Sequence, residues 1–224
     1  MIFWRRRLGE QKKPFEAISR QALQRLPLYL NYLRGQKQEG GHISAPAIAA
    51  DLGLNEVQVR KDLAAVSSQA GKPKKGFDIA LLTQDIERFL GYDNVNRAVL
   101  VGAGHMGSAL LSYRGFSEYG LEIVAAFDNS PSIIGQSIGG KTVLPMEKLP
   151  GLCQRLNAHI GIITVPSASA QDACDALVAG GVLAIWNFAS AHLLVPEGIL
   201  VYHENMAASL AALSQHLREK MREN

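Results

Sequence analysis

Apolar residues recur at helical spacing near the start of the chain, between Ser19 and about Gln38. Spacings of three and four residues place them on one face of a helix, and that face is expected to be buried. The positions are Ala22, Leu23, Leu26, Tyr29, Leu30 and Leu33. Pro27 falls inside this pattern, so either one helix kinks there or a second helix begins with Pro27 in its first turn.

Two shorter helices are predicted next. Ser44 is an expected N-cap, with Pro46 in the first turn of a helix that ends near Gly53. Asn55 is a second expected N-cap and opens a helix through about Ser67. The apolar positions of this second helix are Val57, Val59, Leu63 and Val66. Two short helices with a tight connection are typical of a helix-turn-helix.

The segment after these helices has the composition of a turn. Residues 71–77 are rich in glycine, proline and lysine, which predicts a loop between two short strands. A three-helix core with such a basic loop is a winged helix. Residues 79–91 are then expected to form a connecting helix, and residues 92–96 a linker.

After residue 96 the pattern changes to apolar, β-rich runs separated by helix-length segments. The runs that predict strands lie at 98–101, 123–127, 160–165, 182–187 and 199–202. The segments that predict helices lie at 105–117, 146–156 and 168–180. This alternation favours an α/β fold with a Rossmann-type, doubly wound parallel sheet. A last helix, from Asn205 to Asn224, carries an apolar stripe of Met206, Leu210, Leu213 and Leu217.

The net charge of +3 is unevenly distributed along the chain. Residues 1–77 hold 14 Lys and Arg against 6 Asp and Glu, a net of +8. Residues 78–224 hold 9 against 14, a net of −5. A basic first part on an acidic remainder indicates that the first part binds a polyanion.

Composition excludes other classes of protein. With 47% hydrophobic residues the chain can bury a core, and no apolar run approaches the roughly 18 residues that cross a bilayer, so no membrane contact is expected. No apolar segment follows Arg5, Arg6 and Arg7, so a secretory signal is not expected. Cys153 and Cys174 lack the spacing of metal ligands, which predicts buried thiols in a reducing cytoplasm and no metal site.

A glycine-rich turn follows the strand at 98–101. Its sequence is Gly102-Ala103-Gly104-His105-Met106-Gly107. Gly102 permits the tight turn, Gly104 lets the backbone approach phosphates, and Gly107 allows the next helix to pack closely on the strand. The free N–H groups and the dipole at the start of that helix favour an anion. This turn therefore predicts a site for a cofactor pyrophosphate.

Asp128 ends the second strand of the same unit, 21 residues beyond Gly107. A carboxylate there accepts hydrogen bonds from the hydroxyls of an adenosine ribose and repels a 2′-phosphate. No Lys or Arg follows Asp128 before Lys141. The sequence therefore favours NAD(H) over NADP(H) as the cofactor.

Later strand ends supply further candidates, because the carboxyl ends of the strands border the ligand crevice of a doubly wound sheet. The candidates for the nicotinamide half are Thr164, Val165, Pro166, Trp186, Asn187 and Phe188. These residues are equally compatible with ordinary strand ends.

The second helix of a helix-turn-helix enters a DNA major groove. Its polar positions here are Gln58, Arg60 and Lys61. Arg60 is the best base reader because it can bond guanine with two N–H groups, whereas Lys61 suits a phosphate. The other candidates for DNA contact are Ser44, Lys72, Lys74 and Lys75. The alternative is a solvated basic face on a small helical domain.

The two halves together resemble the Rex family of bacterial redox-sensing transcriptional repressors, from about Arg20 to Leu217. The residues that carry the resemblance are Arg25-Leu26-Pro27-Leu28-Tyr29-Leu30, Gln58-Val59-Arg60-Lys61-Asp62-Leu63, Val101-Gly102-Ala103-Gly104-His105-Met106-Gly107, Ala126-Phe127-Asp128, Thr164-Val165-Pro166, Ala170-Gln171, Asn187-Phe188 and Val195-Pro196.

The resemblance implies a homodimer in which the C-terminal helix is swapped onto the partner subunit. It implies that double-stranded operator DNA is bound by the free or NAD⁺-bound protein and released by NADH. It also implies that Tyr113, Asn205 and Met206 lie near the nicotinamide of the partner subunit.

The expected organisation follows from these patterns and from the resemblance. We expect a basic N-terminal arm at 1–18, a winged-helix DNA-binding domain at 19–91, a Rossmann NAD(H)-binding domain at 92–203 and a C-terminal dimerisation helix at 204–224. The apolar stripe of the last helix is also compatible with packing inside one subunit.

Two departures from the family pattern change what we expect. Asn205 stands where the family has an acidic residue, and a neutral amide makes no charge-assisted contact. In the wing, a stretch rich in glycine and aromatic residues is replaced by Ser67-Ser68-Gln69-Ala70 and an inserted Pro73. We therefore expect a weakened or rewired NADH response and an altered operator preference.

Three other functions are alternatives to that of a cytoplasmic repressor. An NAD-dependent dehydrogenase needs a substrate domain with a catalytic group near the nicotinamide. Only about 20 residues follow the last predicted strand, and the nearest candidates, His192 and His203, are of a kind that is more often structural. The second rival is a DNA-binding protein that holds a CoA thioester, and the third is a structural dimerisation module. We expect no enzyme.

Overall fold

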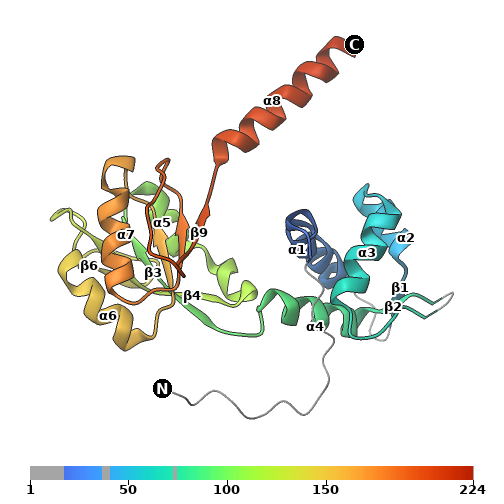
Figure 1. Cartoon of the computed structure of the whole chain (residues 1–224), viewed down its shortest axis with the longest axis horizontal. Helices are drawn as coiled ribbons and strands as arrows, with labels where there is room; N and C mark the ends of the chain where they lie inside the picture. The colour runs from blue at the N-terminus through green and yellow to red at the C-terminus, as the bar shows by residue number, and fades with distance from the viewer. Residues whose placement is uncertain (1–17, 37–40, 73–74, 224) are drawn as a thin grey trace. The chain divides into compact units, whose positions relative to one another are not determined.

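A computed structural model describes residues 18–36, 41–72 and 75–223, which form two compact units (Figure 1). The first unit extends to Asp93 and the second begins at Asn94. Apart from Ile18, the basic arm expected at 1–18 lies outside the described residues, as do Pro73 and Lys74 of the wing. Within the described residues, no helix combines the length and the apolar character needed to cross a membrane.

The first unit is helical with one small sheet. Its elements are α1 (Arg20–Gly35), β1 (His42–Ile43), α2 (Ala45–Leu52), α3 (Glu56–Val66), β2 (Phe77–Asp78) and α4 (Ile79–Leu90). Helix α1 continues through Pro27 as one element, because Leu26 and Leu30 on either side are fully buried in the core and offset the hydrogen bond that proline removes. It ends at Gly35, before the predicted Gln38.

The helix-turn-helix predicted from the sequence is formed by α2 and α3. Both predicted N-caps are confirmed, because the side chains of Ser44 and Asn55 accept backbone N–H groups at 3.2 and 3.1 Å. Gly53 ends α2 with a left-handed φ of 64°. Of the four apolar positions named for this helix, Val57 does not lie in the core. Its side chain is 58% exposed, because it lies about 200° around the helix from the buried Val59.

The wing differs from the predicted hairpin. Strand β2 pairs antiparallel with β1, which precedes α2 and was not predicted. Across the loop, the described residues pair only through an isolated bridge between Lys72 and Gly76. Gly76 is required there, since its φ is 82° and a Cβ would lie 2.1 Å from the carbonyl oxygen of Ile43. Helix α4, expected as a connector, packs Leu82 and Ile86 into the core of this unit.

The second unit is a seven-stranded sheet with helices on both faces. Its strands are β3 (Asn96–Val101), β4 (Leu121–Asp128), β5 (Ser137–Ile138), β6 (Lys141–Pro145), β7 (Ile160–Ile163), β8 (Ala184–Asn187) and β9 (Leu200–His203). Its α-helices are α5 (His105–Ser112), α6 (Leu149–Leu156), α7 (Ala170–Ala179) and α8 (Met206–Glu223). Short 3-10 helices are η1 (Arg114–Tyr119), η2 (Met146–Lys148) and η3 (Ser167–Ser169).

The strand order is β5-β6-β4-β3-β7-β8-β9, and all pairs are parallel except β5 with β6. The order reverses between β3 and β7, where a doubly wound sheet binds its ligand. The predicted α/β fold is confirmed. Strands β5 and β6 were not predicted, and the single helix predicted at 105–117 is divided at Tyr113 into α5 and η1.

The two faces of the sheet bury separate cores. Val99 and Phe127 pack with α6 and α7 on one face, whereas Leu100 and Ala126 pack with α5 on the other. Burial of the consecutive residues 98–101 of β3 is what a parallel sheet covered on both sides requires. The two cysteines, at positions 153 and 174, are buried in the first core, as predicted, and burial raises the pKa of both thiols.

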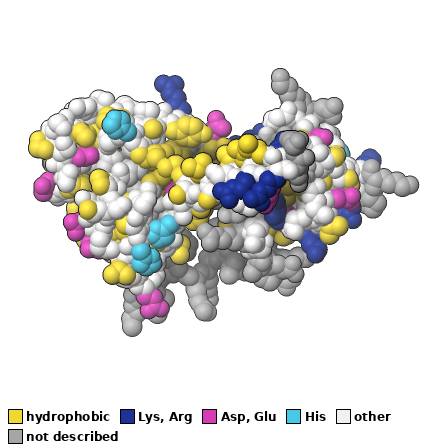
Figure 2. All heavy atoms as spheres, turned by 90° about the horizontal axis from the view of Figure 1, so that it is seen from above, with side chains coloured by type: hydrophobic (Ala, Val, Ile, Leu, Met, Phe, Trp, Pro, Cys, Tyr) yellow, Lys and Arg dark blue, Asp and Glu magenta, His cyan; other side chains and the backbone are white. Residues whose placement is uncertain are grey.

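Helix α8 exposes its apolar stripe within the single chain. Hydrophobic side chains, yellow in Figure 2, are visible at the surface of the molecule. Those on α8 that are more than half exposed are Met206, Leu210, Leu213, Leu217 and Met221. The alternative that the stripe packs inside one subunit does not hold for this structure. An apolar helix face of this length requires a partner surface.

Candidate cofactor and nucleic-acid sites

The glycine-rich turn lies at the switch point of the sheet, beside the end of β7. Gly102 has a φ of 95°, and a Cβ there would lie 2.7 Å from Val165 Cγ1. A Cβ on Gly107 would lie 1.9 Å from the carbonyl oxygen of Gly102. A Cβ on Gly104, in contrast, would meet nothing within 4 Å. The first and third glycines are therefore required by packing, and the second leaves open space beside the turn.

Helix α5 begins directly at this turn. Its N-cap is Gly104, which has no side chain to cap the first-turn N–H groups. His105 and Met106 are exposed in that first turn, whereas Ala103 is buried. The positive end of the helix dipole is thus available to an anion at the end of β3. The residues present fit the predicted phosphate site.

Asp128 lies beside the same turn. One carboxylate oxygen accepts the N–H of Ala103 at 2.8 Å, and the other accepts the N–H of Ser130 at 2.8 Å. The side chain is half-buried, and each oxygen keeps a second lone pair. These bonds fix the carboxylate next to the turn.

Thr164 connects the turn to β7. Its hydroxyl lies 2.6 Å from the carbonyl oxygen of Gly102 and 3.1 Å from that of Val101, and its N–H donates to Val101 as well. Val165 is half-buried against Gly102, and Pro166 is exposed ahead of η3. The hydroxyl of Thr164 therefore holds the turn in place, a contribution that the sequence did not reveal.

Asn187, one of the candidates for the nicotinamide half, lies at the end of β8. Its side chain is fully buried, and its amide donates to the carbonyl of Ala191 at 3.0 Å and contacts His203 Nδ1 at 3.0 Å. Its oxygen accepts the N–H of Ala189 at 2.9 Å. A buried amide must satisfy its own polar atoms, and these bonds connect Asn187 to the ends of β8 and β9.

Phe188 belongs to a group of aromatic side chains at this edge of the sheet. The ring centroid of Trp186 lies 4.8 Å from that of Phe188 and 5.9 Å from that of Phe116. The ring centroids of Phe116 and Tyr113 are 4.9 Å apart. Tyr113 itself is 53% exposed. The buried Nε1 of Trp186 has no hydrogen-bond partner within the part of the chain that the structure describes. From the sequence, Trp186 is a candidate for the nicotinamide half together with Asn187 and Phe188.

Asn205 and Met206, which the family resemblance places near the nicotinamide of the partner subunit, lie at the start of α8. Met206 is 61% exposed. The side-chain oxygen of Asn205 accepts the N–H of Ala208 at 2.9 Å and so caps α8. In the single chain Asn205 therefore has a helix-capping role.

The exposed face of α3 holds the predicted DNA-contacting side chains. Arg60 forms an ion pair with Glu56 one turn earlier, and Lys61 is exposed beside it. Gln58 is exposed, but its Nε2 donates to Asp62 at 2.9 Å. The buried carboxylate of Asp62 therefore fixes the orientation of the Gln58 amide. Val57 is exposed on this helix too.

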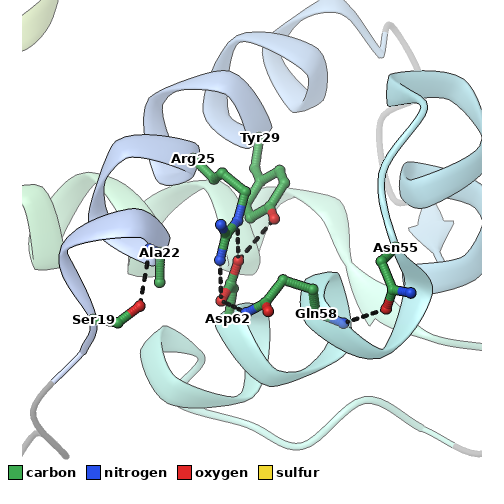
Figure 3. A network of polar contacts seen from close by, with 7 residues as sticks. All are labelled: Ser19, Ala22, Arg25, Tyr29, Asn55, Gln58 and Asp62. Atoms are coloured by element: carbon green, nitrogen blue, oxygen red, sulfur yellow. Dashed lines mark hydrogen bonds and ion pairs between the residues drawn. The ribbon is translucent and has the colours of Figure 1, made fainter.

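Asp62 is the centre of a polar network between α1 and α3 (Figure 3). Its buried carboxylate accepts Arg25 Nε at 2.7 Å, Arg25 Nη2 at 3.1 Å and the hydroxyl of Tyr29 at 2.8 Å. Burial opposes ionisation of Asp62, but the bonds from Arg25, Gln58 and Tyr29 outweigh it and hold the pKa of the carboxyl below 3.8. Burial and the bond to Asp62 raise the pKa of Tyr29 to about 12. The network fixes α3 on α1.

The remaining predicted contacts lie around the helix-turn-helix. The Ser44 hydroxyl is used as the cap of α2, and Lys72 and Lys75 are exposed on either side of the wing loop. No group of three or more His, Cys, Asp and Glu that could hold a metal ion occurs among residues 18–36, 41–72 and 75–223.

Two family models match the sequence. One is described as a putative DNA-binding protein N-terminus and matches residues 17–64, and the other is described as a CoA binding domain and matches residues 93–191. The redox-sensing transcriptional repressor Rex of Treponema denticola is 38% identical over 95% of this chain and 100% of its own length. That of Bacteroides fragilis is 36% identical over 92% of this chain and 94% of its own length.

Solved structures of the repressor RSP, of the Rex family, are similar to this chain over nearly its whole length. RSP in complex with β-NAD⁺ and operator DNA has a TM-score of 0.84 and 29% identity, over 92% of this chain and 95% of that chain. RSP in complex with β-NADH has a TM-score of 0.81 and 28% identity, over 92% and 97%.

A helix-turn-helix unit followed by a Rossmann unit with an intact phosphate-binding turn defines a ligand-responsive DNA-binding regulator. The identity to curated relatives extends through both units. The chain belongs to the Rex family of redox-sensing transcriptional repressors.

Proposed function

We propose that this chain is a transcriptional repressor that binds operator DNA when it is free or NAD⁺-bound and releases it when NADH binds. The observation that carries the proposal is the glycine-rich turn. Gly102 and Gly107 are held by close packing, and the space at Gly104 is left open in a chain 38% identical to a Rex repressor. A repressor acts where the chromosome is, so the proposal includes the cytoplasm.

The cofactor would be held by the turn and by the carboxylate beside it. The N–H groups at residues 104–107 would bind the pyrophosphate, and Asp128 would accept the ribose hydroxyls. Thr164 would position the turn, and the aromatic group with Tyr113, Val165, Pro166 and Phe188 would border the nicotinamide. The nicotinamide supplies the difference in charge and planarity between its oxidised and reduced forms to which the repressor responds.

DNA would be bound by the exposed face of α3 and by the wing. Arg60 would bond a guanine edge, Lys61 a phosphate, and Val57 would contact a thymine methyl group. The wing lysines, Lys72 and Lys75 together with Lys74, would add phosphate contacts that are the same for every sequence.

A homodimer would bury the stripe of α8. The five exposed apolar side chains of this helix are what a swapped helix presents to a partner subunit. Asn205, at the base of α8, caps the helix without carrying a charge. We therefore expect the coupling between NADH and DNA to be weaker than with a carboxylate at this position, because a neutral amide forms weaker hydrogen bonds.

CoA is the second candidate ligand, because a CoA binding domain model matches residues 93–191. Asp128 argues against it. CoA carries a phosphate on the ribose where NAD(H) has a free hydroxyl, and the carboxylate would repel that phosphate. The relatives are named as repressors, so the chain is a regulator, and the proposal includes no catalytic turnover.

The test is a titration of the full-length protein on DNA. Duplexes enriched from a random-sequence library by the purified protein define its operator, and NADH, NAD⁺ or CoA is then added to the complex. NADH should release the DNA, and NAD⁺ and CoA should not. Equal effects of NADH and NAD⁺ would remove redox sensing from the proposal, and release by CoA alone would replace the ligand.

A further inference from the structure

Arg60, the expected base reader, is paired with Glu56 one turn earlier on α3. The two side chains are 62% and 46% exposed, so water weakens the pair and it exchanges readily with other partners. The pair therefore contributes little to folding. Its main consequence is for what the exposed face of α3 can bind.

Glu56 also occupies the start of α3, where it is the acidic residue of the first turn. The first turn of a helix attracts anions through its N–H groups and the positive end of its dipole. Asn55 satisfies the N–H of Gln58 at 3.1 Å. A carboxylate at position 56 interacts with the positive end of the α3 dipole. It also repels a DNA phosphate that approaches the same turn.

The carboxylate affects phosphates and bases differently. An Arg60 side chain that leaves Glu56 for a phosphate exchanges one anion for another, and the two anions then repel each other. A guanine edge instead offers two neutral acceptors, O6 and N7. The guanidinium has five N–H groups, so Arg60 can bond these acceptors while it keeps its contact with Glu56.

We propose that Glu56 is a specificity-determining residue of α3, which reserves Arg60 for a base edge and lowers the affinity for DNA that lacks the preferred base. The inference rests on the proposed function, because α3 must enter DNA. Glu56 weakens binding to every sequence, but it weakens binding to non-operator DNA more.

The test compares two duplexes at several salt concentrations. The first is the duplex that the wild-type protein enriches from a random-sequence library, and the second has the same bases in shuffled order. Glu56→Gln is expected to raise affinity for the shuffled duplex about fivefold and for the enriched duplex less than about twofold. Because one more phosphate is contacted, the slope of log affinity against log salt for the shuffled duplex should steepen by about one.

Two further variants separate the effect from bulk charge. Glu87, on α4, forms an exposed ion pair with Arg34, on α1. Glu87→Gln removes the same charge as Glu56→Gln and should leave the ratio of the two affinities unchanged. In an Arg60→Ala background, Glu56→Gln should change both affinities equally, because the proposed discrimination acts through Arg60.

The outcomes are distinct. A lower ratio in Glu56→Gln with an intact ratio in Glu87→Gln supports the proposal. An equal rise for both duplexes, or an unchanged salt slope for the shuffled duplex, overturns it and leaves the repressor function standing. If the wild-type protein enriches no duplex, the proposed function itself fails.

Discussion

The hydroxyl of Thr164 lies 2.6 Å from the carbonyl oxygen of Gly102, so the end of β7 is tied to the glycine-rich turn after β3. Thr164→Val keeps the shape of the side chain and removes this bond. We expect a loss of about 1 kcal/mol in the free energy of unfolding and an NADH affinity about fivefold weaker, because the turn loses a support. Urea unfolding and fluorescence titration with NADH measure the two effects.

Thr83→Val is the matched control for that change. Thr83 donates its hydroxyl to the carbonyl of Ile79 at 2.8 Å within α4, far along the chain from the turn. The control should lose comparable stability and keep its NADH affinity. Equal NADH affinities in the two variants would contradict a positioning role for Thr164.

Asp128→Asn tests the proposed ribose contact. The amide oxygen can still accept the N–H of Ala103, so the turn after β3 should keep its shape, whereas the bond from the N–H of Ser130 is lost. Bonds from ribose hydroxyls to the amide are weaker without the charge. We expect NADH affinity to fall about tenfold, which corresponds to about 1.4 kcal/mol, and discrimination against NADPH to shrink. Glu122→Gln, earlier in β4, removes the same charge and should bind NADH normally. Unchanged NADH binding in Asp128→Asn would place the ribose elsewhere.

Asp62→Asn tests the network that fixes α3 on α1. The change should cost about 2 kcal/mol, less than for a fully buried pair, because the Arg25 side chain is 22% exposed. Since the folded-state pKa of Asp62 lies below 3.8, its contribution is fully present above about pH 5 and is lost as pH falls through that pKa. The stability difference between wild type and variant should therefore shrink in acid. Urea unfolding at neutral and acid pH measures it, and a difference that stays constant would refute the assigned direction.

Leu213→Glu tests the proposed dimer. The side chain is 65% exposed in the single chain, so the substitution should leave the folded subunit intact and place a charge in the subunit interface. Sedimentation should show a monomer. Ala212→Glu adds the same charge on the other side of α8 and should remain dimeric. If both variants or neither dissociate, the stripe is not the interface.

The sequence predicted the elements that are determined by local chemistry. Ser44 and Asn55 indicated helix starts because a capping side chain acts on its own first turn. The order of strands and helices indicated the parallel sheet, although β5 and β6 were missed. Strand β6 (Lys141–Pro145) has one polar end and lies near the edge of the sheet, so it lacks the continuous apolar run of a central strand.

Contacts between distant segments were beyond the sequence. Val57 fits a helical apolar pattern, and only the packing of α3 shows that it points to solvent. Asn187 ends a strand as a crevice residue would, and only the structure shows that its buried side chain forms three hydrogen bonds within the subunit. Gln58 looked free for DNA, and the network around Asp62 orients it.

By itself, the sequence determined the class of fold, the glycine-rich turn with Asp128 and the family. The helices and the turn could be predicted because spacing along the chain controls the hydrogen bonds within a turn or helix, and the family followed from the ordered set of motifs. Only the tertiary structure decided which side chains support the sites and which remain open to a ligand. Thr164 reaches Gly102 across 62 residues, and such a pairing depends on how the strands are ordered in the sheet. The tertiary structure likewise left the stripe of α8 exposed in the single chain, because no apolar surface among residues 18–36, 41–72 and 75–223 covers it.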